Sequence, residues 1–135
     1  MAGAGPAIER RSVIPPMKAF WNDRGRGVDS QSPKTVDLKE AGMIWSDEVR
    51  GVKGNFFGLV DEQGNVVQFY FDEGIPNHVD DAGHLEVVLM DFPQPHMNGS
   101  YATRVKIAAV HGLIEKAFRE GADFRKFDGL IFMRW

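Results

Sequence analysis

The sequence predicts an α+β fold in which one long helix packs on a predominantly antiparallel sheet of about four to five strands. Three patterns favour this fold: a β-hairpin over residues 56–71, a helical period over residues 101–120, and a segment rich in glycine and proline over residues 1–34. Strand patterns followed by a helix are typical of domains in which the helix covers one face of the sheet. We therefore expect an extended N-terminal arm and a single α+β domain over residues 35–135.

The first 34 residues are predicted to form an extended or partly disordered basic arm, because glycine and proline recur through them. Within the arm, Met17, Phe20 and Trp21 carry large apolar groups that need a surface to cover. We expect this segment to dock on its own domain, with contact to another protein as the alternative. Together with Trp135, these three residues are the candidate partner-binding residues.

Strand patterns begin after the arm. A short strand is predicted at residues 43–45, and a hairpin at residues 56–60 and 66–71, whose connection supplies glycine and asparagine for a tight turn. Another strand is predicted over residues 84–92, where apolar residues occupy both faces and two prolines follow. The sheet is expected to be antiparallel in this region.

The helix is predicted over residues 101–120, with Ser100 as its N-cap and Gly121 as its end. Its apolar positions recur at helical spacing and are Ile107, Val110, Leu113, Ile114, Ala117 and Phe118. A final strand is predicted over residues 127–135. If that strand lies beside the one ending at Phe92, a right-handed crossover through the helix would make the pair parallel.

Composition and charge limit the function. The 135 residues are 43% hydrophobic and 26% charged, as in ordinary globular proteins. No apolar run approaches the roughly 18 residues of a membrane span, and the N-terminus lacks the apolar core of a signal peptide. A cysteine count of zero excludes disulfides and thiolate chemistry. We therefore expect a soluble, cytoplasmic protein that does not bind membranes.

The net charge of −3 opposes binding to nucleic acid. It is unevenly distributed, because residues 1–28 carry five basic and two acidic side chains, which leaves −6 for the rest of the chain. An acidic surface of this kind favours a basic protein partner.

The connection between the predicted strands at 66–71 and 84–92 is long and rich in acidic residues and histidine. Loops of this length often carry function, and these side chains suit zinc, manganese or iron. The candidate metal ligands are His78, Asp80, Asp81, His84 and Glu86. The sequence shows no H-E-x-x-H or EF-hand spacing, so turn capping by the aspartates is the preferred interpretation. We predict no cofactor, with a divalent metal as the alternative.

Ser100 and Arg104 form a second candidate site. At a helix N-terminus they would face free N–H groups able to hold an anion, although capping by Ser100 alone explains the same residues.

Three functions are compatible with these patterns. In size and charge the chain resembles small binding and inhibitor proteins of bacteria, including toxin-neutralising immunity proteins, which implies a non-enzymatic module that binds a protein partner or a second copy of itself. The contact surface would be the acidic loop, the exposed helix face or the aromatic arm. The first alternative is a metal-assisted hydrolase or acid/base enzyme centred on residues 72–86. The second is a small-ligand-binding domain with an apolar pocket between helix and sheet.

Overall fold

The computed structural model describes residues 14–135, which form an eight-stranded sheet and two α-helices. The strands are β1 (Met17–Asp23), β2 (Arg26–Val28), β3 (Lys34–Val36), β4 (Phe56–Val60), β5 (Val66–Phe71), β6 (Val88–Gln94), β7 (Gly99–Val105) and β8 (Ile131–Arg134). The helices are α2 (Leu38–Met43) and α3 (Val110–Glu120), with a π-helical turn η1 (Ile44–Glu48) and three 3-10 turns, η2 (Pro95–Met97), η3 (Ile107–Ala109) and η4 (Phe124–Lys126).

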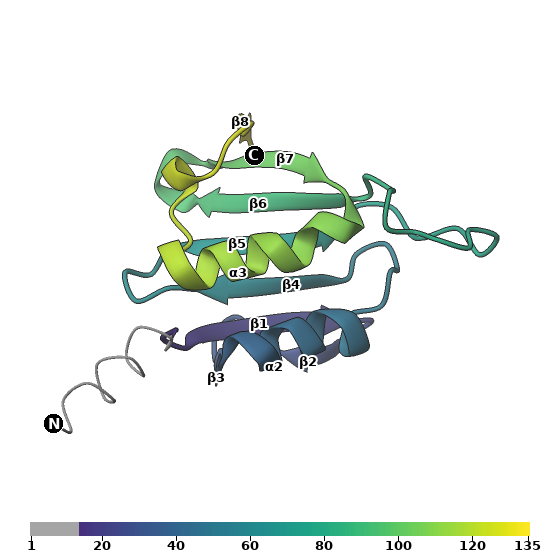
Figure 1. Ribbon diagram of the computed structural model, residues 1–135. Helices are drawn as coiled ribbons and strands as arrows, with labels where there is room; N and C mark the ends of the chain where they lie inside the picture. The colour runs from purple at the N-terminus through teal and green to yellow at the C-terminus, as the bar shows by residue number, and fades with distance from the viewer. Residues whose placement is uncertain (1–13) are drawn as a thin grey trace, which may run out of the picture.

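Every strand pairing in the sheet is antiparallel. The order is β2-β1-β4-β5-β6-β7-β8, and β3 pairs with the first half of β1. Figure 1 shows the resulting meander, with β1 to β3 at the bottom and β8 at the top. The α+β class and the antiparallel sheet are confirmed, and the predicted number of strands was too low.

The segment that was predicted as an arm supplies strands of this sheet. Residues 17–23 form β1, which pairs with β4 on one side and with β2 and β3 on the other. Its partners come from both the arm and the predicted domain, so the domain includes residues before position 35. The part of the predicted arm over residues 1–13 lies outside the described residues.

The predicted helix over residues 101–120 was too long. Residues 99–105 form β7, and α3 begins only at Val110. The turn between β6 and β7 contains Asn98 in the left-handed conformation, with φ of 54°. Residues 101–105, which were predicted to begin the helix, therefore lie in the second strand of a hairpin. Because β8 pairs with β7 rather than β6, the final strand is antiparallel to its neighbour.

The short strand predicted at residues 43–45 is helical. The Asp37 side chain accepts a hydrogen bond from the backbone N–H of Glu40 over 2.7 Å and caps α2, which continues directly into η1. Trp45 from this turn stacks on Phe71 of β5, with ring centroids 5.2 Å apart. The Asp37 cap and the buried Trp45 side chain therefore stabilise helical structure where a strand was predicted.

Both helices lie on the same face of the sheet (Figure 1). The buried residues of α3 are Val110, Ile114, Ala117 and Phe118, which confirms the apolar stripe expected from the helical period. They pack on inward-facing strand residues such as Leu59, Phe69 and Phe92, none of which is exposed. No helix within residues 14–135 combines the length and apolar character needed to cross a bilayer.

No helix formed by residues 14–135 lies on the opposite face of the sheet, and we call it the open face. Phe20 points to this face from β1 yet is only 4% exposed. Its ring lies over Gly58 of β4, where a Cβ atom would overlap it, and meets Phe56 edge to face with centroids 6.1 Å apart. The sheet thus covers its own open face near β1 and β4.

This packing predicts opposite effects for two glycine-to-alanine changes. We expect Gly58→Ala to lower the free energy of unfolding by about 1–3 kcal/mol, because the new methyl group displaces the Phe20 ring. Gly112→Ala on α3 meets nothing within 4 Å, so it should raise stability by about 0.5–1 kcal/mol through helix propensity. Urea unfolding of both variants measures the effects. Equal stability of Gly58→Ala and the wild type would contradict the packing.

Candidate functional site

The open face is hollowed where β5, β6 and β7 meet the C-terminal tryptophan. This depression, which we call the sheet hollow, has a volume of about 480 Å³. It is lined by Gln68, Tyr70, Leu89, Asp91, Pro93, Ser100 and Trp135. The register explains the grouping, since Gln68 lies opposite Asp91, Tyr70 opposite Leu89 and Pro93 opposite Ser100, and opposed residues of paired strands point to the same face.

Asp91 supplies the carboxylate side chain among the residues that line the sheet hollow. Gln68 Nε2 donates to Asp91 Oδ2 over 3.2 Å, and the Ser100 hydroxyl lines the same hollow. Burial raises the pKa of Asp91 above its ordinary value of 3.8, because removal from water penalises the carboxylate more than the neutral polar groups of Ser100 and Gln68 favour it.

Trp135 lines the sheet hollow together with Asp91 and is held there by hydrogen bonds. Its indole Nε1–H donates to Ser100 Oγ over 3.0 Å, and its backbone N–H donates to the carbonyl oxygen of Asn98 over 2.9 Å. Although its indole nitrogen is bonded, the residue remains 66% exposed. The indole is thus held at the rim of the sheet hollow in a largely exposed residue.

The rim continues along the edge strand β8. Ile131 is 69% and Met133 49% exposed, and alternation along a strand places them on one face, with Trp135 two positions further on. Opposite them in β7 lie Ala102 and Ser100 on the open face. We call Ile131, Met133 and Trp135 the apolar rim.

Arg104 lies on the same face but is engaged elsewhere. Its guanidinium pairs with the Asp72 carboxylate at the end of β5, with N–O distances of 2.7 and 2.9 Å. The predicted anion site of Ser100 and Arg104 at a helix N-terminus does not form as expected, because both residues lie in β7 and Ser100 is buried beside Asp91. Ser100 serves the sheet hollow instead.

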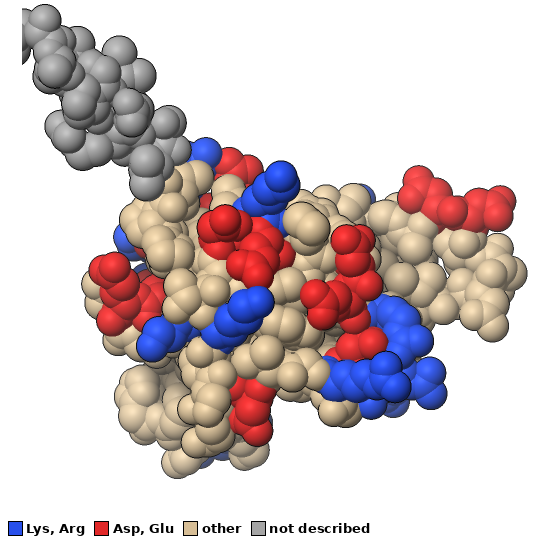
Figure 2. Space-filling model, turned by 90° about the horizontal axis from the view of Figure 1, so that it is seen from below, with Lys and Arg blue, Asp and Glu red and all other residues tan. Residues whose placement is uncertain are grey.

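The predicted metal ligands remain in and beside the long loop, which extends from one end of the sheet (Figure 1) and places acidic side chains at its tip (Figure 2). β6 begins at Val88, so His84 and Glu86 lie before the strand on which they had been placed. Asp81 Oδ1 accepts from the backbone N–H of Gly83 over 3.0 Å, as a turn cap does. Within residues 14–135, no three histidine, aspartate or glutamate side chains form a group that could hold a metal ion. His78, Asp80, Asp81, His84 and Glu86 are therefore not brought together as a ligand set.

The four candidate partner-binding residues separate by burial. Met17, Phe20 and Trp21 are buried in β1, as expected if the segment docks on its own domain, and their side chains offer a partner little surface. Trp135 is exposed and belongs to the apolar rim.

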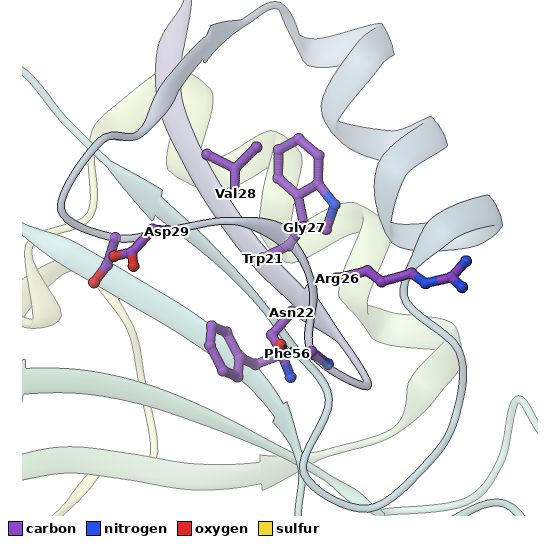
Figure 3. A pocket seen from close by; sticks show the side chains of 9 residues that line it. Trp21, Asn22, Arg26, Gly27, Val28, Asp29 and Phe56 are labelled. Carbon is purple, nitrogen blue, oxygen red and sulfur yellow. Dashed lines mark hydrogen bonds between the residues drawn. The ribbon is translucent and has the colours of Figure 1, made fainter.

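A second hollow lies beside the β1–β2 hairpin. It has a volume of about 310 Å³ and is lined by Trp21, Asn22, Gly25, Arg26, Gly27, Val28, Asp29, Ser30 and Phe56. Figure 3 shows Asn22 beside Phe56, while the Arg26 side chain points away from both. Asn22 Oδ1 accepts from the backbone N–H of Gly25 over 3.0 Å, so this polar group serves the turn.

One pair on the helical side has the distance of a nucleophile and its base. Ser46 Oγ lies 2.8 Å from His111 Nε2. Both residues are exposed, and on its other side His111 Nδ1 faces the backbone of α2 near Gly42. A nucleophilic site requires an orienting acceptor and an enclosed space for substrate, and this pair has neither among the described residues.

Gln68, Tyr70 and Asp91 were not among the site residues predicted from the sequence. A usable signal was present, because Gln68 and Tyr70 alternate with Val67, Phe69 and Phe71 and so share the second face of a strand. Asp91 lay within the strand predicted over residues 84–92, but its position opposite Gln68 depends on the strand register, which the sequence did not fix. The two prolines after Asp91 also suggested that the strand ended at Phe92. β6 in fact includes Pro93.

Comparisons of the chain with models of protein families, with curated proteins and with solved structures each gave no significant match.

The raised pKa of Asp91 predicts that its charge opposes folding at neutral pH. When the folded-state pKa of an acid exceeds the unfolded value, stability falls as pH rises through the interval between them. We therefore expect Asp91→Asn to be more stable than the wild type at pH 7, and the difference to disappear below about pH 3.8, where both states hold the proton. Urea unfolding across this range measures it.

Asp72→Asn provides a control of opposite sign. It removes the partner of the half-exposed Arg104 guanidinium, so stability at pH 7 should fall by up to about 1 kcal/mol. Destabilisation by Asp91→Asn at pH 7 would show that the carboxylate is compensated in the free protein.

Proposed function

We propose that the protein is a non-enzymatic binding module that contacts a protein partner through the apolar rim and the sheet hollow. The observation that carries the proposal is the exposure of Ile131, Met133 and Trp135 side by side on one edge strand. An exposed cluster of large apolar groups beside a polar depression is typical of protein contact surfaces.

The chemistry of this surface supports a partner rather than a reaction. Tryptophan and tyrosine are the residues that most often dominate binding energy at protein interfaces, and here Trp135 and Tyr70 line one hollow. The indole is also fixed in place through Ser100, so little side-chain entropy is lost on binding.

The edge position of β8 gives a partner a further means of contact. An edge strand presents backbone groups that can pair with a strand of another chain. β8 is bonded to β7 on one side, and within residues 14–135 it is the last strand of the sheet order. A partner strand added there would bring side chains directly onto Ile131 and Met133.

The other two functions receive less support from the described residues. The metal-assisted enzyme requires His78, Asp80, Asp81, His84 and Glu86 to converge, and they form no three-ligand group. The ligand-binding alternative placed an apolar pocket between helix and sheet. Buried side chains form one core there, and the hollow of about 310 Å³ beside the end of α3 includes the charged residues Asp61, Glu62 and Lys126 in its lining. The sheet hollow lies on the opposite face.

Capture experiments with a matched pair of variants test the proposal. The full chain, tagged at its N-terminus, is used at low ionic strength, and captured proteins are quantified by mass spectrometry. We expect Trp135→Ala to reduce recovery of the partner by at least about tenfold, because a central aromatic anchor contributes 1–2 kcal/mol or more.

Met43→Ala is the control. Met43 is 52% exposed on α2, so it removes similar apolar surface from the helical side and should leave recovery unchanged. Light scattering reports whether the captured species is a second copy. Equal recovery by the wild type and Trp135→Ala, with both folded, would contradict the proposed surface.

A further inference from the structure

We propose that the sheet hollow receives an arginine side chain of the protein partner, with the Asp91 carboxylate as its counter-charge. This inference rests on the proposed function, because it names the group that the binding surface recognises. Its basis is the combination in one depression of a carboxylate, two aromatic side chains and a neutral hydrogen-bonding floor.

The charge of Asp91 favours a cationic ligand. Among residues 14–135, the ion pairs involve Asp23, Glu40, Asp72, Glu115 and Asp123, so Asp91 has no cationic partner there. The guanidinium nearest along its own face, that of Arg104, is held by Asp72 in a two-contact ion pair. The side-chain hydrogen bond that Asp91 receives within the described residues comes from the neutral amide of Gln68, and the neutral Ser100 hydroxyl lines the same depression. A partly desolvated carboxylate in this state is complemented by a cation and repels an anion.

The aromatic side chains beside Asp91 favour arginine over lysine. A guanidinium is planar, is weakly hydrated, stacks on aromatic rings and binds a carboxylate through two parallel hydrogen bonds. Tyr70 and Trp135 line the depression together with Asp91, so both kinds of contact are offered. The compact and strongly hydrated ammonium of lysine would use the carboxylate alone.

The apolar surface beside the hollow favours a protein as the source of the arginine. The apolar rim of Ile131 and Met133 borders the depression, and only a group attached to a larger apolar surface would cover it. The chain beyond residue 28 carries a net charge of −6, which attracts a basic partner and speeds its encounter.

The test uses two peptides that differ in charge but hardly in shape. Acetyl-Gly-Arg-Gly-amide and its neutral citrulline counterpart are titrated separately into the full chain, and binding is followed by NMR. The reporter is the indole N–H of Trp135, which donates to Ser100 at the edge of the hollow and is assigned by its absence in Trp135→Phe. We expect saturable shifts of this signal with the arginine peptide and at least about tenfold weaker binding of the citrulline peptide. Equal binding of both would overturn the inference.

Matched charge variants identify the counter-charge. We expect Asp91→Asn to weaken binding of the arginine peptide by at least about tenfold. Glu115→Gln removes the same charge from α3, where Glu115 pairs with Arg119, and should leave the affinity unchanged. Urea unfolding confirms that each variant is folded. An affinity unaffected by Asp91→Asn would overturn the inference.

Further measurements distinguish failure of this inference from failure of the proposed function. They also distinguish an arginine of a partner from an arginine of this chain. If Trp135-dependent capture holds while the arginine peptide does not bind, the inference fails and the proposed function stands. If the peptide binds and no partner depends on Trp135, the proposed function fails and with it the protein source. Tighter peptide binding by Arg10→Ala/Arg11→Ala would show that the chain itself occupies the hollow, and a dimer lost in both Arg134→Gln and Asp91→Asn would assign the arginine to a second copy. Either result overturns an independent partner.

Discussion

Helices cover one face of the sheet, so each strand residue that points to the open face must be covered by other strand side chains or must meet solvent. Near β1 and β4 the first solution operates, because Gly58 leaves room for Phe20 to lie flat on the sheet and become almost fully buried. Near β6 to β8 no such cover exists within the described residues, and Trp135 stands exposed at the rim of a hollow. The difference between the two halves of one face locates the candidate site.

The carboxylate in that hollow is held under conditions that oppose its charge. Burial raises the pKa of Asp91, and its neutral partners compensate only in part. A residue that lowers stability and has no cation to balance it is more readily explained by binding than by folding. Ser100 accepts a hydrogen bond from the Trp135 indole and lines the same hollow as this carboxylate, so a partner that contacts the indole lies close to Asp91.

Local periodicity accounts for the parts of the fold that the sequence predicted well. The β5 alternation and the α3 stripe are contained within single segments, and each pattern has one physical interpretation. The region 101–105 failed because its apolar residues fit a helical spacing as well as an alternation, and pairing with β6 and β8 decides between them. The sheet hollow was not predicted for a related reason. Asp91 and Trp135 line one depression only when β5, β6 and β7 pair in the observed register.

The two edges of the sheet are built differently, and this contrast bears on function. β2 is three residues long and contains Arg26 and Gly27, both of which discourage edge-to-edge pairing. β8 is also short and ends in the exposed Arg134. Unlike β2, it also exposes the large apolar residues Ile131 and Met133, which natural sheets usually avoid at an edge. This contrast supports the proposal that a partner covers the apolar rim. Binding would also bring a partner's side chains over Asp91, and the charge that opposes folding in the free chain would then favour the complex.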